Sequence, residues 1–589
     1  MSVLLNRDGD SVVLRAPRVA VEVAKQIPGA RHDRLAQVWR YPLSWATCVV
    51  ARGVFGADLE VGPELAEWAR HEYETRVLPA MSAGSSEEPD LPLLYGFQRV
   101  GVRFLRVAGS ALLADDMGTG KSAQTITALE REDAYPALVV CPNSVKSTWA
   151  REYRKWAPTR RVVVARSGAA LAEEDATLVA NGGADVLVVN WEALKGLSRL
   201  APFGSVRLEP CSNCDPTSTR RPSSCQREDK VLNLVGWRAI VADEAHRAKD
   251  PHAQQTRALW ALGDRAERRI ALTGTPIANT AEDLWSVLRF VSPDEFPTKW
   301  AWIERYALTS PNFYSGGVDV YGLRPDTRPE LDKILLPRLL RRTKAEVLTD
   351  LPAVVRERRD VVLPHKQRKA YDQMAREMDA DIEGGTIVAD NVLVASLRLR
   401  QLASAYGEVT STQNYKFDDH GQAIEYVDQQ VRLTEPSAKL DVLEEVLEEL
   451  GDRQAVIFAE SAQLIELAHA RLAKRGDRVA MIIGSVPQTE RGGIIEEFGR
   501  GIYQYLLLTL GVGGEGVDGL QVADTAIFLQ RPWSAVLDKQ AEARLHRLGQ
   551  QSQSVTYIDL VTKDTIEDKV FSALRAKADA LEDVVHDAV

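Results

Sequence analysis

This chain of 589 residues has few cysteines, no long apolar runs and no excess of positive charge. Its five cysteines are too few and too scattered for a disulfide-stapled secreted scaffold, so we expect a reduced protein. No apolar run approaches the roughly 18 residues that a membrane-spanning helix needs, and we expect no membrane partner. The N-terminal MSVLLNRDGD also lacks the basic and apolar regions of a signal peptide.

Acidic residues outnumber basic ones, with 83 Asp and Glu against 73 Lys and Arg and a net charge of −10. This balance excludes a globally basic, histone-like binder, so any nucleic-acid surface must be a local patch. The remaining composition, 45% hydrophobic and 26% charged, is that of an ordinary globular protein. The length allows several domains.

Short runs that are apolar on both faces recur along the chain, separated by segments long enough for helices. This pattern predicts parallel strands covered on both sides, and therefore an α/β fold with two parallel-sheet lobes. The runs are ALLA, ALVVC, RVVVA, DVLVV, AIVA and RIALT before residue 275, then AVIFA, RVAMII, YLLLT, TAIFL and VTYIDLV after residue 454.

The same pattern predicts the domain boundaries. We expect a small α+β domain at 1–85, a linker at 81–92, a first lobe at 90–350 with a cysteine-containing insertion at 205–232, helical insertions and a linker at 351–435, and a second lobe at 436–589. The second lobe opens on SAKLDVLEEVLEELG, whose four leucines fall with Val446 on one helical face before Gly451.

A phosphate-binding loop is predicted within LLADDMGTGKSAQTITALE at 112–130. Gly118, Thr119 and Gly120 bring backbone N–H groups around phosphate oxygens at a helix N-terminus, Lys121 reaches the phosphates, and Ser122 binds Mg²⁺. Asp115 replaces the first glycine of the strict pattern. A glycine turn that only caps a helix is the alternative.

Two carboxylates in VADEAH follow the strand at 239–242, at the edge where parallel sheets bind ligands. Asp243 can hold Mg²⁺ and Glu244 can orient a water for attack on the γ-phosphate of ATP. In TGTP, Thr273 and Thr275 offer two hydroxyls that can sense the same phosphate. A surface acidic pair is the alternative for the two carboxylates.

These motifs, in this order, resemble those of a Swi/Snf-type ATPase of helicase superfamily 2 over about residues 90–570. LLYGFQRVGVRFL, ADDMGTGKS with an aspartate where glutamate is usual, CPNSVKSTWAREYRKW, DEAHRAKD, LTGTPIANTAEDLW and LRRTKAEVLTDLP match the first lobe. VIFAES, IIGSVPQTERGGIIEEF, LLLTLGVGGEGVDGLQVADTAIFLQRPW and QAEARLHRLGQ match the second.

The resemblance implies two RecA-like lobes with ATP between them and DNA across both. It implies that Gln98 reads adenine and that Arg544 and Arg547 act as arginine fingers. The further roles that it implies are DNA contacts from Ser144, Lys146, Thr509 and Trp533, and coupling by Thr273, Thr275, Gly516 and Gln540.

Two positions depart from the family pattern. GGEGVDGLQ is one residue longer than the family's glycine motif, which leaves the register of DNA contacts around 513–521 open. Ala543 stands where aspartate is usual before Arg544, which removes a positioning carboxylate. Neither change touches the phosphate chemistry.

The N-terminal IPGARHDRLAQVWRYPLS resembles, more weakly, the HARP-type module of annealing helicases. Trp39, with the neighbouring arginines, either stacks on DNA bases or belongs to the domain core.

In CSNCDPTSTRRPSSC, Cys211, Cys214 and Cys225 either bind Zn²⁺, although a fourth ligand is missing, or are free thiols in a loop.

We therefore expect a DNA-dependent ATPase that uses ATP and Mg²⁺ to move along duplex or forked DNA and to remodel or reanneal DNA or DNA–protein complexes. The alternatives are a strand-separating helicase and a DNA-binding scaffold with an inactive ATPase. We expect a monomeric, cytoplasmic protein, and the excess of arginine over lysine favours a bacterial or phage source.

Overall fold

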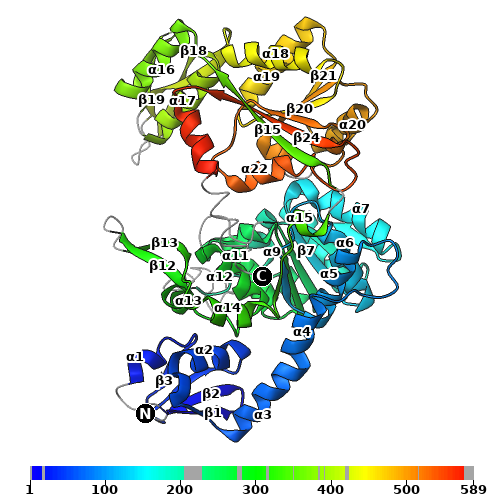
Figure 1. Cartoon of the computed structure of the whole chain (residues 1–589), viewed down its shortest axis with the longest axis vertical. Helices are drawn as coiled ribbons and strands as arrows, with labels where there is room; N and C mark the ends of the chain where they lie inside the picture. Colours follow the sequence, from blue (N-terminus) through cyan, green and yellow to red (C-terminus); the bar gives the residue numbers. More distant parts are fainter. Residues whose placement is uncertain are drawn as a thin grey trace. The chain divides into compact units, whose positions relative to one another are not determined.

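The computed structural model describes residues 3–15, 20–203, 229–274, 281–312, 317–348, 351–382, 385–389, 392–417, 423–514 and 517–575. They form two compact units that divide between residues 349 and 350 (Figure 1). No described helix has both the length and the apolar character needed to cross a membrane.

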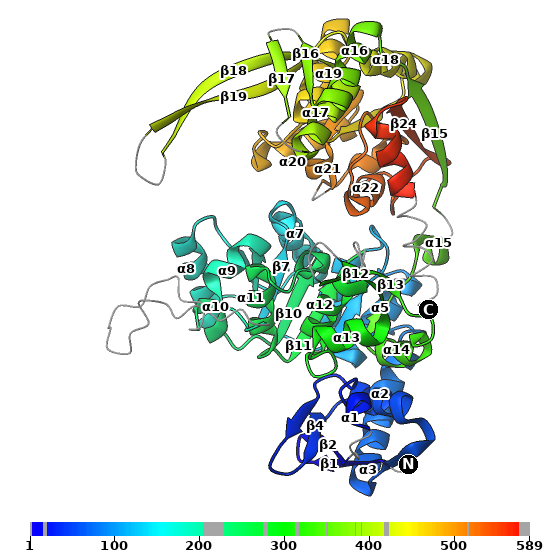
Figure 2. The same cartoon turned by 90° about the vertical axis from the view of Figure 1, so that its left-hand side faces the viewer.

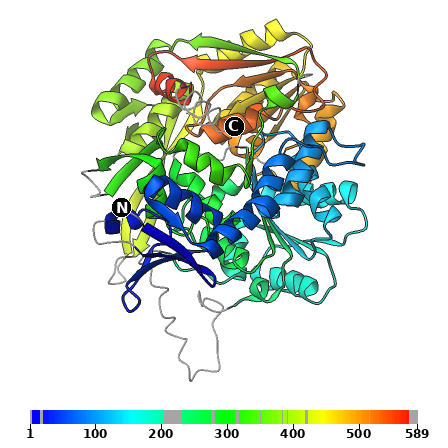
Figure 3. The same ribbon diagram turned by 60° about the horizontal axis from the view of Figure 1, so that its bottom comes forward.

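The first unit begins with a small domain whose elements are dark blue in Figure 3. Three helices accompany its mixed five-stranded sheet: α1 (Val21–Ala24), α2 (Trp45–Phe55) and α3 (Pro63–Glu72). The strands of the sheet, in order across it, are β3 (Arg31–Asp33), β4 (Val38–Pro42), β2 (Ser11–Arg15), β1 (Val3–Asp8) and β5 (Leu59–Val61).

The segment that we expected to be a linker, 81–92, is partly helical and is held in place. After α3, a π-helical turn (Tyr73–Val77) continues directly into α4 (Leu78–Ala83). Ala83 is buried, and the buried carboxylate of Glu88 pairs with Arg106. Although its composition is polar, this stretch therefore makes specific contacts with the rest of the unit.

The larger part of the first unit is built on a seven-stranded sheet in which every strand pairs in parallel with its neighbour. All the apolar runs predicted as strands before residue 275 lie in it. In order across the sheet, the strands are β14 (Leu339–Leu340), β6 (Ala111–Leu113), β11 (Arg268–Leu272), β10 (Ala239–Asp243), β7 (Ala137–Cys141), β9 (Val186–Asn190) and β8 (Val162–Val164).

Helices cover both faces of this sheet, as its doubly apolar strands require. One face carries α5 (Gly96–Ala108), α6 (Lys121–Arg131) and α7 (Lys146–Trp156), whose buried side chains share a core with the strands. On the other side lie α9 (Leu194–Leu197), α11 (Gln254–Gly263) and α12 (Ala281–Val291) (Figure 1). Helix α8 (Ala169–Ala180) and the short helix α10 (Val231–Leu234) also belong to this part.

Between α12 and β14 the chain forms α13 (Lys299–Tyr306), the antiparallel hairpin of β12 (Ala307–Asn312) and β13 (Gly317–Leu323), and α14 (Arg328–Leu335). The N-terminal domain packs on this region, because the Trp45 indole of α2 donates to the Lys333 carbonyl of α14 at 3.1 Å. The short helix α15 (Lys344–Val347) follows β14 and ends the described part of the unit.

The second unit is built on a six-stranded sheet that is also parallel throughout. Its helices include α19 (Ala462–Arg475), α20 (Gln488–Gly499), α21 (Leu510–Gly514) and α22 (Ala535–Glu542). In order across the sheet, the strands are β15 (Ala353–Val361), β24 (Ser554–Thr562), β23 (Thr525–Phe528), β20 (Ala455–Ala459), β22 (Tyr505–Thr509) and β21 (Val479–Ile482). The predicted α/β class with two parallel-sheet lobes is therefore confirmed.

Residues 351–435 contain more strand than the helical insertions and linker that we expected. Besides α16 (His365–Glu377) and α17 (Val392–Ser404), they supply the edge strand β15, the pair β16 (Asp379–Ile382) and β17 (Gly385–Val388), and a long hairpin of β18 (Tyr406–Phe417) and β19 (Ala423–Thr434). The hairpin extends away from the rest of its unit (Figure 2). These strands lie at an edge or outside the sheet, so they lack the doubly apolar pattern of central strands.

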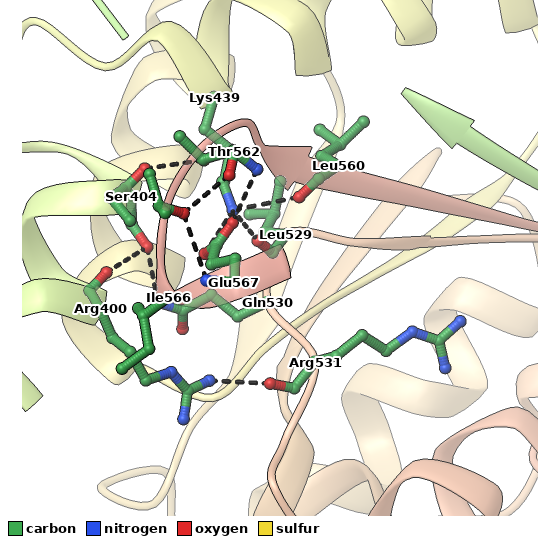
Figure 4. Close-up of polar contacts among 12 residues, drawn as sticks. Arg400, Ser404, Lys439, Leu529, Gln530, Arg531, Leu560, Thr562, Ile566 and Glu567 are labelled. Atoms are coloured by element: carbon green, nitrogen blue, oxygen red, sulfur yellow. Dashed lines mark hydrogen bonds and ion pairs between the residues drawn. The ribbon is translucent and has the colours of Figure 1, made fainter. Parts of the chain in front are cut away.

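Helix α18 (Ala438–Leu450) buries the predicted apolar face and ends at Gly451, whose φ of 63° is left-handed. Its first turn also buries Lys439 completely. The ammonium donates to the carbonyls of Leu529 (2.6 Å) and Leu560 (3.1 Å) and pairs with both oxygens of Glu567 at 2.6 and 2.7 Å (Figure 4). Burial lowers the pKa of Lys439, and the Glu567 carboxylate opposes that shift.

Because the buried Lys439 charge is balanced by a single carboxylate, Glu567→Gln should be costly. We expect the second lobe to lose roughly 3–5 kcal/mol of unfolding free energy, since an uncompensated ammonium then remains buried. The measurement is urea denaturation, in which hydrogen exchange of the β23 and β24 amides reports the unfolding of the second lobe. Glu496→Gln is the matched control, because the Glu496–Arg500 pair is exposed and its loss should cost less than about 1 kcal/mol. Equal stability of the two variants would contradict the prediction.

Candidate active site

The predicted phosphate loop joins the buried strand β6 to the N-terminus of α6, which begins at Lys121. Gly118 and Gly120 have φ values of 82° and 80°, the left-handed conformation that favours glycine. A Cβ on Gly120 would lie 2.4 Å from the Gln98 amide nitrogen, so a side chain there would push Gln98 out of its place. The loop therefore exposes its backbone as phosphate binding requires.

The Lys121 side chain folds over this loop. Its ammonium donates to the main-chain carbonyls of Asp115 at 2.8 Å and Asp116 at 3.1 Å. The Thr119 hydroxyl donates to the Asp116 carbonyl at 2.8 Å and closes the turn. Lys121 is thus held inside the loop whose phosphate ligand it is expected to reach.

Gln98 lies directly against the phosphate loop. Its side-chain nitrogen donates to the Thr119 carbonyl at 2.9 Å, and its oxygen accepts from the Tyr95 N–H at 3.1 Å. Gln98 is buried, whereas the Tyr95 ring is 56% exposed and close to Phe97. This places an amide and an accessible aromatic ring beside the loop, which suits recognition of a nucleotide base.

The carboxylate of Asp243 sits at the carboxyl end of β10. It accepts from the Trp149 indole at 2.8 Å and from the Glu244 N–H at 2.9 Å. Burial, and next the negative charge of Glu244, raise the pKa of Asp243 to about 6, while the bond from Trp149 opposes the rise. A divalent cation would favour the ionised form of this carboxylate, so Asp243 fits the predicted Mg²⁺ role.

Glu244 adopts a left-handed conformation with a φ of 51°, unusual for a residue with a side chain. Its carboxylate lies 3.3 Å from His246 Nδ1, which in turn lies 3.3 Å from the Thr273 hydroxyl. A Cβ on Gly274 would be 2.5 Å from Met117 Cγ, so the end of β11 packs directly on the phosphate loop. The structure thus brings the loop, the two carboxylates and Thr273 to one edge of the sheet.

Two further groups at this edge were not singled out from the sequence. Trp149 belongs to the quoted CPNSVKSTWAREYRKW, yet nothing in the pattern shows that its indole bonds Asp243. Arg342 belongs to LRRTK and pairs with the fully buried Asp115, the residue that departs from the strict phosphate-loop pattern. A buried aspartate in a loop is the signal that a cationic partner must exist.

The two predicted arginine fingers lie just beyond α22 in the second unit. Arg547 forms an ion pair with Asp518, which comes from the glycine motif that is one residue longer than expected. The neighbouring Glu542 pairs with Arg531 (2.8 Å) and with Arg356 (2.6 Å).

Arg531 anchors α22 within a cluster of buried carboxylates. Its guanidinium also pairs with Asp538 at 2.7 Å and Asp559 at 2.6 Å. Burial raises the pKa of Asp538 to about 6, against the attraction of Arg531. The residues that lead to the arginines are therefore fixed by charge pairs rather than by the aspartate that the family pattern implies.

The residues predicted to contact DNA or couple the motifs lie at several places. Ser144 lies in the turn before α7, Lys146 is the first residue of that helix, and the Lys146 ammonium donates to the Ala165 carbonyl at 3.0 Å. In the second unit, Thr509 and Gln540 are buried and Trp533 is 40% exposed. These assignments stay predictions.

Trp39 is half-buried on the N-terminal sheet, with its ring 5.0 Å from that of His32. The neighbouring Arg40 is held by Asp8 at 2.6 Å and Asp33 at 3.2 Å. Both interpretations of Trp39, stacking on DNA bases and packing in the domain core, stay predictions.

Five predicted residues lie outside the described residues: Thr275, Gly516, Cys211, Cys214 and Cys225. Within the described ranges, no group of three or more His, Cys, Asp or Glu side chains is arranged to hold a metal ion. The zinc site stays a prediction.

Comparison with known proteins gives two family matches. The SNF2-related domain matches residues 64–407, and the helicase conserved C-terminal domain matches residues 438–549.

Similar proteins come from plant, animal and bacterial sources. Protein CHROMATIN REMODELING 19 of Arabidopsis thaliana is 29% identical over 86% of this chain and 71% of its own length. Chromodomain-helicase-DNA-binding protein 1-like of Mus musculus is 28% identical over 83% of this chain and 51% of its own, and the putative ATP-dependent helicase/translocase YwqA of Bacillus subtilis is 28% identical over 82% and 47%. The chain thus spans about half of the latter two.

Among solved structures, the Sulfolobus solfataricus SWI2/SNF2 ATPase core in complex with dsDNA is 23% identical, with a TM-score of 0.36, and covers 84% of this chain and 94% of its own.

The hydrogen bond from Trp149 to Asp243 should affect how ATP binding depends on pH. Trp149→Phe removes a donor that favours the ionised carboxylate, so the pKa of Asp243 should rise. Since a hydrogen bond to a charged group is worth about 1.5–3 kcal/mol, the acidic midpoint of Mg²⁺-dependent ATP binding should move up by roughly one pH unit. Fluorescent ATP-analogue titrations between pH 5 and about 8 measure it.

Trp191→Phe is the matched control. Trp191 is equally buried and also bonds Asp243, but its indole donates to the main-chain carbonyl at 3.0 Å instead of the carboxylate. It should therefore leave the midpoint in place. A common shift in both variants would contradict the assignment of Asp243.

Proposed function

Because this chain belongs to the SNF2-related family of ATP hydrolases, we propose that it is a motor that couples ATP hydrolysis to movement along duplex or forked DNA. One observation carries the proposal: a phosphate loop, the Asp243–Glu244 pair and Thr273 meet at a single sheet edge of a chain whose second lobe matches the helicase C-terminal domain. The names of relatives such as the chromodomain-helicase-DNA-binding protein support DNA as the partner.

We assign the chemistry of the first lobe to this edge. The loop N–H groups and Lys121 bind the ATP phosphates, and Ser122 and Asp243 hold Mg²⁺. Mg²⁺ held by these two residues would supply positive charge against the ATP phosphates. Glu244 orients the attacking water, and His246 connects its carboxylate with Thr273.

We assign Arg544 and Arg547 to stabilising the charge that develops on the transferred phosphoryl group. In the structure Arg547 is occupied by Asp518 of its own lobe, so it must leave that carboxylate to act. This fits a motor in which turnover waits for a rearrangement, such as one that DNA promotes.

Movement on duplex DNA requires contacts from a net acidic protein, so binding must rely on a local set of phosphate contacts. We propose Ser144, Lys146, Thr509 and Trp533 for these contacts. The consequence would be remodelling or reannealing of DNA or DNA–protein complexes. Strand separation is the second candidate, which the tests below distinguish.

Substitutions at the sheet edge should separate binding from turnover. Glu244→Gln keeps the phosphate loop and Asp243, so ATP binding should persist while turnover falls by about 10²–10⁴-fold. Lys121→Ala should weaken ATP binding itself. Steady-state hydrolysis and nucleotide titration measure the two effects. Glu174→Gln, on an exposed carboxylate of α8, is the control and should hydrolyse ATP normally. Normal turnover in Glu244→Gln would remove that residue from the chemistry.

The DNA substrate is tested by comparing ligands. Duplex DNA without free ends should stimulate hydrolysis and let the protein displace a triplex-forming strand while the duplex stays paired. Affinity should fall with salt, with a slope of roughly −0.9 per phosphate contact. Lys121→Ala is the motor-dead control. Separation of the duplex strands would favour the helicase alternative, and stimulation by RNA alone would overturn both.

A further inference from the structure

The last strand of the first lobe lies along the phosphate loop. Strand β14 pairs in parallel with β6, and hydrogen bonds continue the ladder past both strands: Leu112 N–H to Arg338 O (2.7 Å), Ala114 N–H to Leu340 O (2.7 Å) and Asp116 N–H to Arg342 O (3.0 Å). The chain that leaves this lobe is therefore joined to the loop main chain up to Asp116.

Side chains strengthen this junction at Asp115. Its carboxylate is completely buried and receives two bonds from the Arg342 guanidinium, at 3.0 Å from Nε and 2.5 Å from Nη2. Arg342 also donates to Gln124 Oε1 at 3.1 Å and to the Phe97 carbonyl. A two-pronged buried pair of this kind fixes geometry, because loss of either partner leaves a buried charge.

A second set of contacts ties Asp116 to the same segment. Its carboxylate accepts from the Lys344 N–H at 2.9 Å, at the start of α15. Arg341 donates to the carbonyls of Ala114 (3.2 Å) and Gly274 (3.4 Å). The segment 341–344 thus contacts both the phosphate loop and the residue after Thr273, within a few residues of the division at 349.

The same two loop residues bind the phosphate-loop lysine. Lys121 donates to the carbonyls of Asp115 and Asp116, the residues whose side chains hold Arg342 and the Lys344 N–H. A phosphate that draws the ammonium away would remove a donor from both carbonyls. Their backbone can then shift, and the paired side chains pass the shift to residues 341–344.

We propose that Asp115 and Arg342 are positioning residues that carry nucleotide binding at the phosphate loop into residues 343–348, the segment that leads to the second lobe. The proposal rests on the proposed function, since it supplies the first lobe's share of coupling in the motor. It gives the departure at Asp115 a role that a glycine there would not have.

Hydrogen exchange of the full chain tests this directly. With Mg²⁺ and a slowly hydrolysed ATP analogue, the wild type should change exchange both at 116–122 and at 343–348. In Arg342→Gln the change at 116–122 should remain, whereas that at 343–348 should shrink by roughly fivefold or more, as loss of a coupling free energy predicts. Asp115→Asn, which keeps the side chain's shape, should show the same separation.

Arg305→Gln is the matched control. Arg305 forms an equally two-pronged, poorly exposed pair with Glu330 at 2.7 and 2.5 Å, in a part of the lobe that belongs to α13 and α14. It should lower stability while leaving the response at 343–348 intact, so general destabilisation is separated from lost coupling.

Several results would overturn the proposal: no response at 343–348 in the wild type, a full response in both pair variants, or loss of the fold in both. The proposed function fails separately, if duplex DNA does not stimulate wild-type hydrolysis. If DNA does stimulate hydrolysis, the wild type should displace the triplex-forming strand. The amount of strand that Arg342→Gln displaces per ATP hydrolysed should then be lower than in the wild type by roughly fivefold or more.

Discussion

The parallel pairing of β6, β11 and β10 is the constraint on which the first lobe depends. Because neighbouring parallel strands end at the same edge, segments far apart in the chain deliver Lys121, Asp243 and Thr273 to one place. Helices on both faces hold the strands in register, and the loops at the edge are then free to carry chemistry. The close packing of Gly274 on Met117 shows how little space separates two of these loops.

Buried charge pairs are the second organising feature, and each lobe uses them where segments must meet in one geometry. Lys439 and Glu567 join the start of α18 to the ends of β23 and β24, and Arg531 fixes α22 through three carboxylates. Removing one partner of such a pair leaves a buried, uncompensated charge, so each pair resists separation of the segments that it joins. The pairs at α22 and at the phosphate loop lie close in the chain to the residues that we assign to ATP.

The departures from the family pattern acquire physical meaning in the structure. Beside Ala543, which has no carboxylate, Glu542 pairs with Arg531 and Arg356. The longer glycine motif brings Asp518 to Arg547. One of the two predicted arginine fingers, Arg547, is therefore held by a carboxylate of the longer glycine motif.

The sequence alone determined the central strands, the phosphate loop and the helix at 438–450, because periodicity and glycine conformation are properties of neighbouring residues. It also placed Asp243 and Glu244 at a strand end. Tertiary structure decided the partners of buried polar groups: Arg342 is 227 residues from Asp115, and Trp149 is 94 residues from Asp243. It also decided edge strands such as β15, which need not be apolar on both faces. Such contacts depend on which segments fold side by side, and no local pattern records that.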